Sequence, residues 1–224
     1  MFNEFTKWLF DKDSKLLKSI FISLLASFIT LGVLYYFKLR YIEDFIPKYG
    51  LYALLIILTY SIILPSMNYV RAYREFACMS GMMIGMTMGM IAGFLPGLYI
   101  GANNGMFWGS IFGMASGILF GAWNGKCCGI MGVMEGIMAG FMGGLMGAMT
   151  AVMMLNDNLK AASIIIFIIS GSIMIGLNYM IYKETRQMEK KAETDDAINI
   201  FLSIMLTGLS IWLMVFGPKS VLFQ

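Results

Sequence analysis

The side chains in this chain with the most scope for chemistry are those that carry sulfur. The 224 residues include 23 Met and 3 Cys but no His. Without His, the chain lacks the commonest general base and metal ligand, and every Ser–His or Cys–His catalytic pair is excluded. Thiolate and thioether sulfur select soft cations, Cu(I) above all. We therefore expect soft-metal handling rather than an enzyme.

The methionines of segment 127–155 share one face if that segment is a helix. At 100° per residue, the seven methionines from Met131 to Met153 fall within an arc of about 120°, and the glycines of the segment fall on the opposite side. Segment 77–99 carries a second methionine stripe. A row of weak thioether sites would let an ion pass from one site to the next. The candidate ligands in the two rows are Met82, Met86, Met90, Met131, Met134, Met138 and Met142.

Cys78, Cys127 and Cys128 would complete this metal site. Each begins an apolar segment at the end that we expect to be cytoplasmic. Thiolate holds a soft ion more tightly than thioether does, and Lys126 would favour the thiolate form if it lies close. The three cysteines therefore predict a cytoplasmic site from which Cu(I) leaves for a metal carrier. Small buried hydrophobic residues are the alternative role.

Glu135 is the only acidic residue inside a predicted span, and it falls on the methionine side of its segment. An ionisable side chain within a membrane is costly, which makes it a candidate for function. Three roles stay open. Glu135 could attract or bind a cation, it could carry protons, or it could be a structural hydrogen-bond partner of Asn124 or Ser116.

The composition places these residues in a membrane. Hydrophobic residues make up 59% of the chain and charged residues 13%, against about 45–50% and about 25% in soluble proteins. The net charge of +3 gives no reason to expect a nucleic-acid partner. Seven apolar spans, each near the roughly 20 residues that a bilayer requires, predict an all-α polytopic membrane protein. They are 16–37, 45–64, 77–99, 105–123, 127–155, 159–182 and 197–216.

The spans divide the chain into four parts and a short end. We expect an interfacial amphipathic helix at 1–15, two spans and a cytoplasmic loop at 16–76, a Gly/Met-rich three-helix core at 77–155, two further spans at 156–220 with a charged loop at 183–196, and a tag scar at 221–224.

Lysine and arginine are distributed unevenly between the loops. Eleven lie on the side of the N-terminus and five on the other side. Because positive charge accumulates on the cytoplasmic side, we expect a cytoplasmic N-terminus and an external C-terminus in a prokaryotic cell membrane. Asn103 and Asn104 would then line an external vestibule, with turn formation as their alternative role.

Glycine recurs at every fourth position from Gly81 to Gly129 and continues, after a shift of phase, to Gly144. Glycines at i and i+4 let helix backbones approach closely in lipid. We expect them to pack the three core helices together, and contact with other copies in a homo-oligomer is the alternative. The expected packing residues are Gly81, Gly85, Gly89, Gly109, Gly113, Gly117, Gly132, Gly136, Gly140 and Gly144.

The segments Gly85–Phe94 and Gly132–Phe141 are similar and lie 47 residues apart. This weak internal repeat predicts that the third and fifth spans are equivalent helices that point the same way. A chance alignment of regularly spaced glycines is the alternative explanation.

Two short elements resemble parts of known metal-uptake proteins. The Met-x-x-x-Met spacing of Met82, Met86 and Met90, together with the glycine series, is similar to elements of the trimeric copper-uptake transporters. The pair Cys127-Cys128 resembles the vicinal cysteines in the membrane spans of mercury-uptake proteins. Each resemblance covers only a few residues, and the copper transporters have three spans, so neither assigns a family.

The sequence leaves three functions open. The first is a transporter or channel for a soft cation, with Cu(I) as the leading ion. The second is a glycine-packed oligomeric channel or mechanical membrane element whose methionines only pack, with Glu135 serving protons or hard cations. The third is a scaffold subunit that binds other membrane proteins. Replacing the methionines by leucine separates the first two, because packing should survive the change and metal handling should not.

Overall fold

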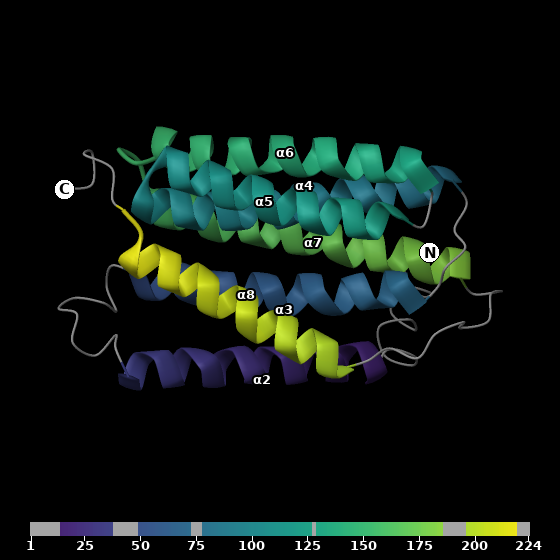
Figure 1. Ribbon diagram of the computed structural model, residues 1–224, viewed down its shortest axis with the longest axis horizontal. Coiled ribbons are helices and arrows are strands. Elements are labelled where there is room, and N and C mark those ends of the chain that lie inside the picture. The colour runs from purple at the N-terminus through teal and green to yellow at the C-terminus, as the bar shows by residue number, and fades with distance from the viewer. Residues whose placement is uncertain (1–13, 38–48, 73–77, 127–128, 186–195, 219–224) are drawn as a thin grey trace.

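The computed structural model describes residues 14–37, 49–72, 78–126, 129–185 and 196–218. Within these ranges it contains helices and no strand, so the expected all-helical class is confirmed there (Figure 1). The seven helices are α2 (Ser14–Phe37), α3 (Leu51–Ala72), α4 (Cys78–Asn104), α5 (Met106–Gly125), α6 (Gly129–Met153), α7 (Leu159–Thr185) and α8 (Asp196–Phe216).

Five helices, α3 to α7, carry an apolar stretch long enough to cross a bilayer. Helices suit lipid because each satisfies its own backbone hydrogen bonds. The described apolar parts of α2 and α8, Ile20–Tyr36 and Ile200–Phe216, are shorter. The chain is therefore a helical membrane protein with five helices of spanning length, and a total of seven spans stays a prediction.

Two helices continue through a proline. The second span was expected at 45–64, but α3 runs from Leu51 to Ala72 and includes Pro65. Helix α4 includes Pro96 and continues to Asn104, beyond the predicted end at residue 99. Proline removes one backbone donor, but a membrane helix tolerates it where neighbouring groups satisfy the freed carbonyl. The predicted second span therefore ended too early, just before Pro65. The predicted third span already included Pro96 but ended five residues before the end of α4.

Three predictions lie wholly or mostly outside the described residues. They are the interfacial helix at 1–15, the charged loop at 183–196 and the terminal segment 221–224.

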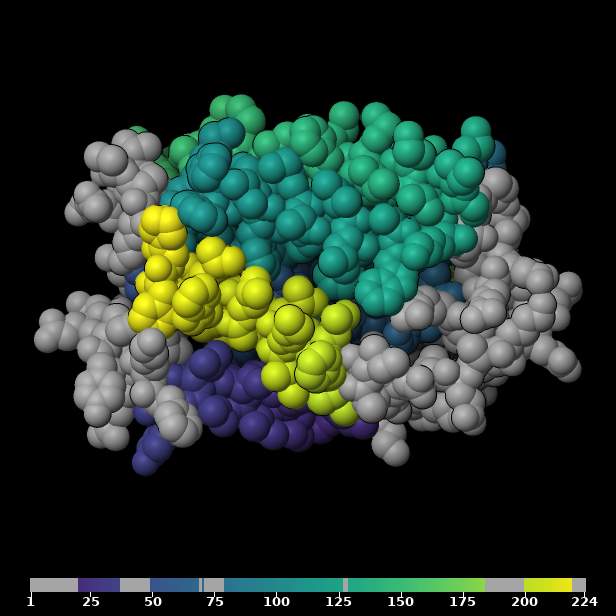
Figure 2. All heavy atoms as spheres, in the orientation of Figure 1, coloured from purple at the N-terminus to yellow at the C-terminus, as the bar shows by residue number. Residues whose placement is uncertain are grey.

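The helices form two groups that meet at α3 and α4. Helix α6 lies at one edge of the molecule beside α4 and α5, and α2 lies at the opposite edge (Figure 1). Helix α8 crosses the front of the molecule between α5 and α2 (Figure 2). The buried residues of α3 pack against those of α4, including Tyr60, Ile84, Met88 and Tyr99. We call α2, α3, α7 and α8 the flanking helices.

Side-chain hydrogen bonds connect the flanking helices. Ser203 of α8 accepts a hydrogen bond from Ser23 of α2 at 3.3 Å and shares one with Ser27 of α2 at 2.7 Å. The hydroxyl groups of Tyr60 in α3 and Ser210 in α8 are 3.0 Å apart. Such polar contacts hold helices together in lipid, where burial of apolar surface gives no driving force between them.

Candidate functional site

Glycines from α4, α5 and α6 meet in successive layers along the axis of a three-helix unit. A Cβ atom added at Gly89 would lie 2.7 Å from the carbonyl oxygen of Gly136 and 3.1 Å from the Cα of Gly121. The three helices therefore touch through bare backbone. We call the following layers the glycine core: Gly85 with Gly125 and Gly132, Gly89 with Gly121 and Gly136, Gly93 with Gly117 and Gly140, Gly97 with Gly113 and Gly144, and Gly101 with Gly109 and Ala148.

The layers fix the register of the three helices. Residue i of α4 lies beside residue i+47 of α6, so these two helices are parallel, and α5 runs antiparallel to both. The offset of 47 equals the separation of the similar segments Gly85–Phe94 and Gly132–Phe141. The prediction that the two helices point the same way is confirmed.

The glycine core leaves no route for an ion along its own axis. A Cβ at Gly113 would lie 2.9 Å from the Cα atoms of both Gly97 and Gly144, and one at Gly117 would lie 2.7 Å from the carbonyl oxygen of Gly140. A gap too small for a methyl group is too small for a water molecule of about 1.4 Å radius. Any ion that follows this unit must therefore travel on its outer surface.

The glycines that we expected to pack helices together are in contact with other helices of the same chain. Eight of the ten have a neighbouring core helix within 4 Å of an added Cβ. Gly132 is itself a neighbour of Gly85 and Gly125, and Gly81 is buried. Packing of the three predicted core helices is thus their role in this structure. A second copy of the chain would have to use a different surface.

Ser116 has a structural role within this unit. The sequence suggested it only as a possible hydrogen-bond partner of Glu135. Pro96 of α4 has no N–H, so the carbonyl oxygen of Ala92 loses its usual partner four residues on. The hydroxyl of Ser116 on α5 donates to that oxygen at 3.0 Å. A proline in one helix with a serine in the next was the available signal, but only the register shows that the two meet.

Asn103 and Asn104 lie at the end of α4, and both are buried. The side-chain amide of Asn103 donates to the carbonyl of Tyr99 at 3.0 Å, and that of Asn104 donates to the carbonyl of Leu213 on α8 at 2.5 Å. These bonds are made within α4 and to α8, and Gly105 is the residue that separates α4 from α5. The external vestibule stays a prediction.

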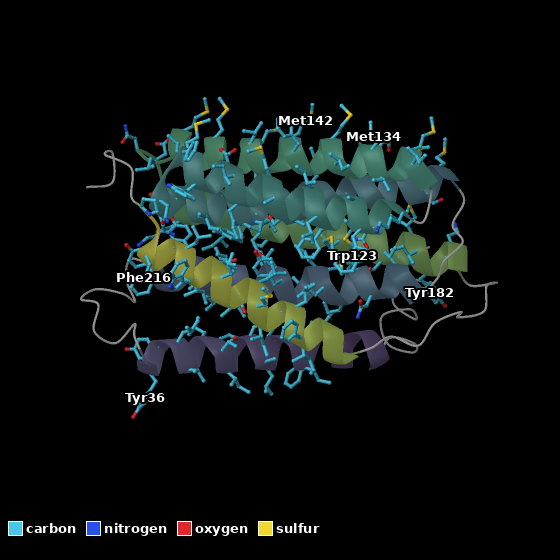
Figure 3. The ribbon with its side chains drawn as sticks, in the orientation of Figure 1. Tyr36, Trp123, Met134, Met142, Tyr182 and Phe216 are labelled. Atoms are coloured by element: carbon cyan, nitrogen blue, oxygen red, sulfur yellow. The ribbon has the colours of Figure 1, made fainter. Side chains whose placement is uncertain are left out.

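Most methionines of α4 and all of those on α6 are exposed on the outside of the molecule. Met134 and Met142 project outward from α6 at the edge of the structure (Figure 3). Exposure reaches 67% at Met131 and 60% at Met138, whereas Met88 of α4 is fully buried. We call the exposed set the methionine face: Met79, Met83, Met86 and Met90 of α4, and Met131, Met134, Met138, Met142, Met146, Met149 and Met153 of α6.

The two parts of the methionine face adjoin each other. Gly143 of α6 packs on Met90 of α4, since its added Cβ would lie 2.6 Å from the carbonyl oxygen and 3.1 Å from the Cα of that residue. Gly147 packs on Phe94 in the same way, one turn further on. The exposed methionines of α4 therefore border α6, and the face covers two neighbouring helices.

Exposed methionines are concentrated on α4 and α6 and are absent from the described surfaces of α2 and α7. All four large exposed hydrophobic residues of α4 are Met, and so are seven of the nine on α6. Among the described residues, the exposed large hydrophobic residues of α7 are all Ile, and none of those on α2 is Met. If lipid contact alone set the composition, these surfaces should be alike. The methionine face therefore differs in composition from the exposed apolar surfaces of α2 and α7.

Glu135 lies at the boundary between α4 and α6 within this face. It belongs to the same stripe of α6 as Ala139, Gly143 and Gly147, at intervals of four residues. Because Gly143 packs on Met90, the same register places Glu135 beside Met82, two turns earlier. Both side chains are half-buried. The register thus places a carboxylate and a thioether at the same level on neighbouring helices, with Met131 and Met138 one turn away on α6.

The three cysteines are only partly located. Cys78 is the first residue of α4, at the end of the unit where α5 finishes and α6 begins. Its side chain, and the whole of Cys127 and Cys128, lie outside the described residues. The side chains that the structure does describe contain no group of three His, Cys, Asp or Glu. Within α4, α5 and α6, the described side chains that could bind a soft cation are the methionines, with Glu135 as the single carboxylate.

Comparisons with known protein families, with curated proteins and with solved structures found no match to this chain. Its function is therefore inferred from the geometry of the α4–α5–α6 unit.

Proposed function

We propose that this membrane protein binds a soft cation, with Cu(I) as the leading ion, on the methionine face and passes it along α4 and α6. The observation that carries the proposal is the composition of the exposed surface: methionine dominates on α4 and α6, whereas isoleucine covers α7. Thioethers are ligands that select soft monovalent cations. A surface chosen only for contact with lipid has no need of them.

The spacing suits stepwise transfer. Methionines at intervals of three and four residues on α6 lie about 5–6 Å apart at Cβ, and the flexible thioether side chain can swing between neighbouring positions. Weak, repeated sites allow an ion to enter and to leave again, as conduction requires. The glycine core would serve as the rigid support that holds the two rows of methionine in register.

Glu135 supplies the negative charge for this route. Beside Met82, its carboxylate would attract a cation to the boundary between α4 and α6. The negative charge would offset part of the free energy needed to move that cation onto an apolar surface. Cys78, Cys127 and Cys128 at one end of the unit would take up the ion and release it to a carrier. No nucleotide-binding motif occurs in the sequence, so this proposal needs a gradient or a partner as the energy source.

A Cu(I) titration of the reduced, purified protein against a competing chelator tests the proposal. The test variant carries Met134→Leu, Met138→Leu and Met142→Leu, and the matched control carries Met205→Leu. Met205 is an equally exposed methionine, 58% exposed, but it lies on α8 outside the methionine face.

We expect the test variant to lose Cu(I) affinity by about tenfold or more and the Met205→Leu control to keep it. A Cys78/Cys127/Cys128→Ser variant, measured in parallel, separates the contribution of thiolate. Equal affinity in the test and control variants would contradict the proposal.

A second function has one observation in its favour. Among the side chains described inside helices, Glu135 is the only acidic one, and its half-buried position would also suit proton or hard-cation transfer. Flux into liposomes separates the two. Glu135→Gln would abolish proton or Na⁺ flux under the second function, whereas the Met→Leu variant would leave that flux unchanged.

A further inference from the structure

We propose that a second copy of this chain covers the methionine face, so that α4 and α6 of one copy pack against α4 and α6 of the other. This inference rests on the proposed function, because a route on the outer surface of one copy needs a second wall. The glycine stripes cannot supply that contact, since the three core helices already occupy them within the chain.

The composition of the outer surface supports a protein occupant over lipid. Isoleucine on α7 is stiff at χ1, and the exposed large hydrophobic residues there are all of this type, such as Ile168 at 63% exposure and Ile173 at 47%. Methionine is flexible and polarizable, and it adapts its shape to irregular contacts. The change from one residue type to the other marks α4 and α6 as a surface that meets something other than acyl chains.

Glu135 points to the same conclusion independently. Ionisable side chains in membrane spans nearly always face protein or water rather than lipid. Glu135 is only half-buried within its own chain, and it is the seventh residue of a helix that is otherwise apolar on this side. A second copy would complete its enclosure and separate it from the hydrocarbon.

The size of the face is sufficient for a specific pair. The 25 residues of α6 extend about 37 Å, and the exposed methionines of α4, from Met79 to Met90, extend about 16 Å. With a helix width of about 10 Å, the face offers about 540 Å² per copy. The pair would then bury about 1,080 Å² in total, just above the roughly 1,000 Å² expected of a specific interface.

Pairing also completes the ion site. Thioethers on one helix approach an ion from one side only, whereas a second copy supplies sulfur from the opposite side. The site would then consist of Met131, Met134 and Met138 from each copy, with two Glu135 carboxylates close to the route. Soft thioether ligands from both sides would enclose Cu(I) and exclude lipid and water from it.

Cysteine cross-linking in liposomes tests the pairing without any metal. In a background with Cys78, Cys127 and Cys128 replaced by Ser, the test variant carries Met138→Cys and the matched control carries Ile168→Cys on α7. Both positions are about equally exposed, at 60% and 63%. A short bis-maleimide adds each of its two double bonds to one thiolate, and it therefore links two chains only where the thiols lie close. Dilution with lipid reduces links that arise from random collision.

We expect covalent dimers from Met138→Cys that persist on lipid dilution, and few or none from Ile168→Cys. Equal yields from both variants, or no dimer from Met138→Cys although a monofunctional maleimide labels it, would overturn the pairing and leave lipid as the occupant. Met146→Cys provides a second test position on the same face, in case Met138→Cys fails to fold.

Dimers without Cu(I) binding would refute only the proposed function, and Cu(I) binding by a chain that yields no specific dimer would refute only the pairing.

Discussion

Glycine occurs in both groups of helices, but it meets different surroundings in each. An added Cβ at Gly117 in the glycine core would lie 2.8 Å from the Cα of Gly140 and 2.9 Å from that of Gly93. Gly171 in α7 and Gly208 in α8 have no neighbouring atom within 4 Å of such a Cβ. The same residue type is therefore a packing requirement in one region and a replaceable position in the other.

The two regions also differ in what joins their helices. Backbone contacts backbone in the glycine core, whereas hydroxyl and amide groups connect the flanking helices, as where Asn178 of α7 donates to Ser66 of α3 at 2.9 Å. A backbone contact has no side chain that can move aside, so any added atom displaces a whole helix. A side-chain hydrogen bond can be lost at the cost of that bond alone. The glycine core should be the rigid part of the molecule.

Gly117→Ala is expected to have the largest effect of a single methyl group. Its Cβ would strike backbone atoms of two helices, and overpacking that cannot relax costs about 3 kcal/mol or more. Gly171→Ala is the matched change in a flanking helix, where we expect a gain of about 0.5–1 kcal/mol from helix propensity. Thermal unfolding in detergent micelles measures both. Similar unfolding temperatures for the two variants would remove the distinction between the regions.

Gly105→Ala is expected to follow in size. Gly105 is the single residue between α4 and α5, with φ 97° and ψ 171°, a conformation that is open almost only to glycine and costs other residues about 1–3 kcal/mol. Gly176→Ala, in open space on α7, is the control. Chemical unfolding in mixed micelles should show the loss for Gly105→Ala alone, and an unchanged midpoint would mean that the turn does not constrain the pair of helices.

Ser203→Ala tests the polar contacts of the flanking helices. Removal of this hydroxyl breaks the contacts with Ser23 and Ser27, and hydrogen bonds between membrane helices contribute about 0.6 kcal/mol on average and about 1.7 kcal/mol at most. We expect a loss within that range, well below that of Gly117→Ala. A loss as large as that of Gly117→Ala would show that the flanking helices are no more tolerant than the core.

Met142→Leu is expected to have the smallest effect on stability. Met142 is 50% exposed, and a swap that conserves volume costs less than about 1.5 kcal/mol even in a core. The midpoint of thermal unfolding should therefore stay close to that of the wild type in detergent, while affinity for Cu(I) falls. A large loss of stability with unchanged affinity would assign the methionine face to packing.

Much of the fold could be predicted from the sequence because its main signals are periodic. The apolar segments predicted the helices, and glycine at every fourth residue predicted close packing of 77–155. Pro65 obscured the end of one helix, because it lies inside α3 beyond the predicted end at residue 64. Pro96 also lies inside its helix, where a neighbouring helix compensates for it. Such compensation depends on contacts between helices, as in the bond from Ser116 to Ala92, and no local pattern reveals it.

The candidate site could be predicted only in part. Periodicity placed Met131, Met134 and Met138 on one side of a helix, but it could not say whether that side faces the interior or the exterior. The methionine side of α6 faces outward because the opposite, glycine side packs against α4 and α5 in the glycine core. The position of Glu135 beside Met82 needed the register between α4 and α6, which the glycine layers fix and the sequence alone does not.

The most direct test of the account follows every methionine at once. With ¹³C-methyl methionine in the protein, Ag(I) as a stable substitute for Cu(I) is added, and the methyl resonances are recorded by NMR. If the methionine face binds soft cations, the resonances of its methionines on α4 and α6 shift. Those of the buried Met67, Met88, Met174 and Met214 and of exposed Met205 on α8 stay unchanged. Shifts at Met205 as large as those of the methionine face, or no shift on α6, would contradict it.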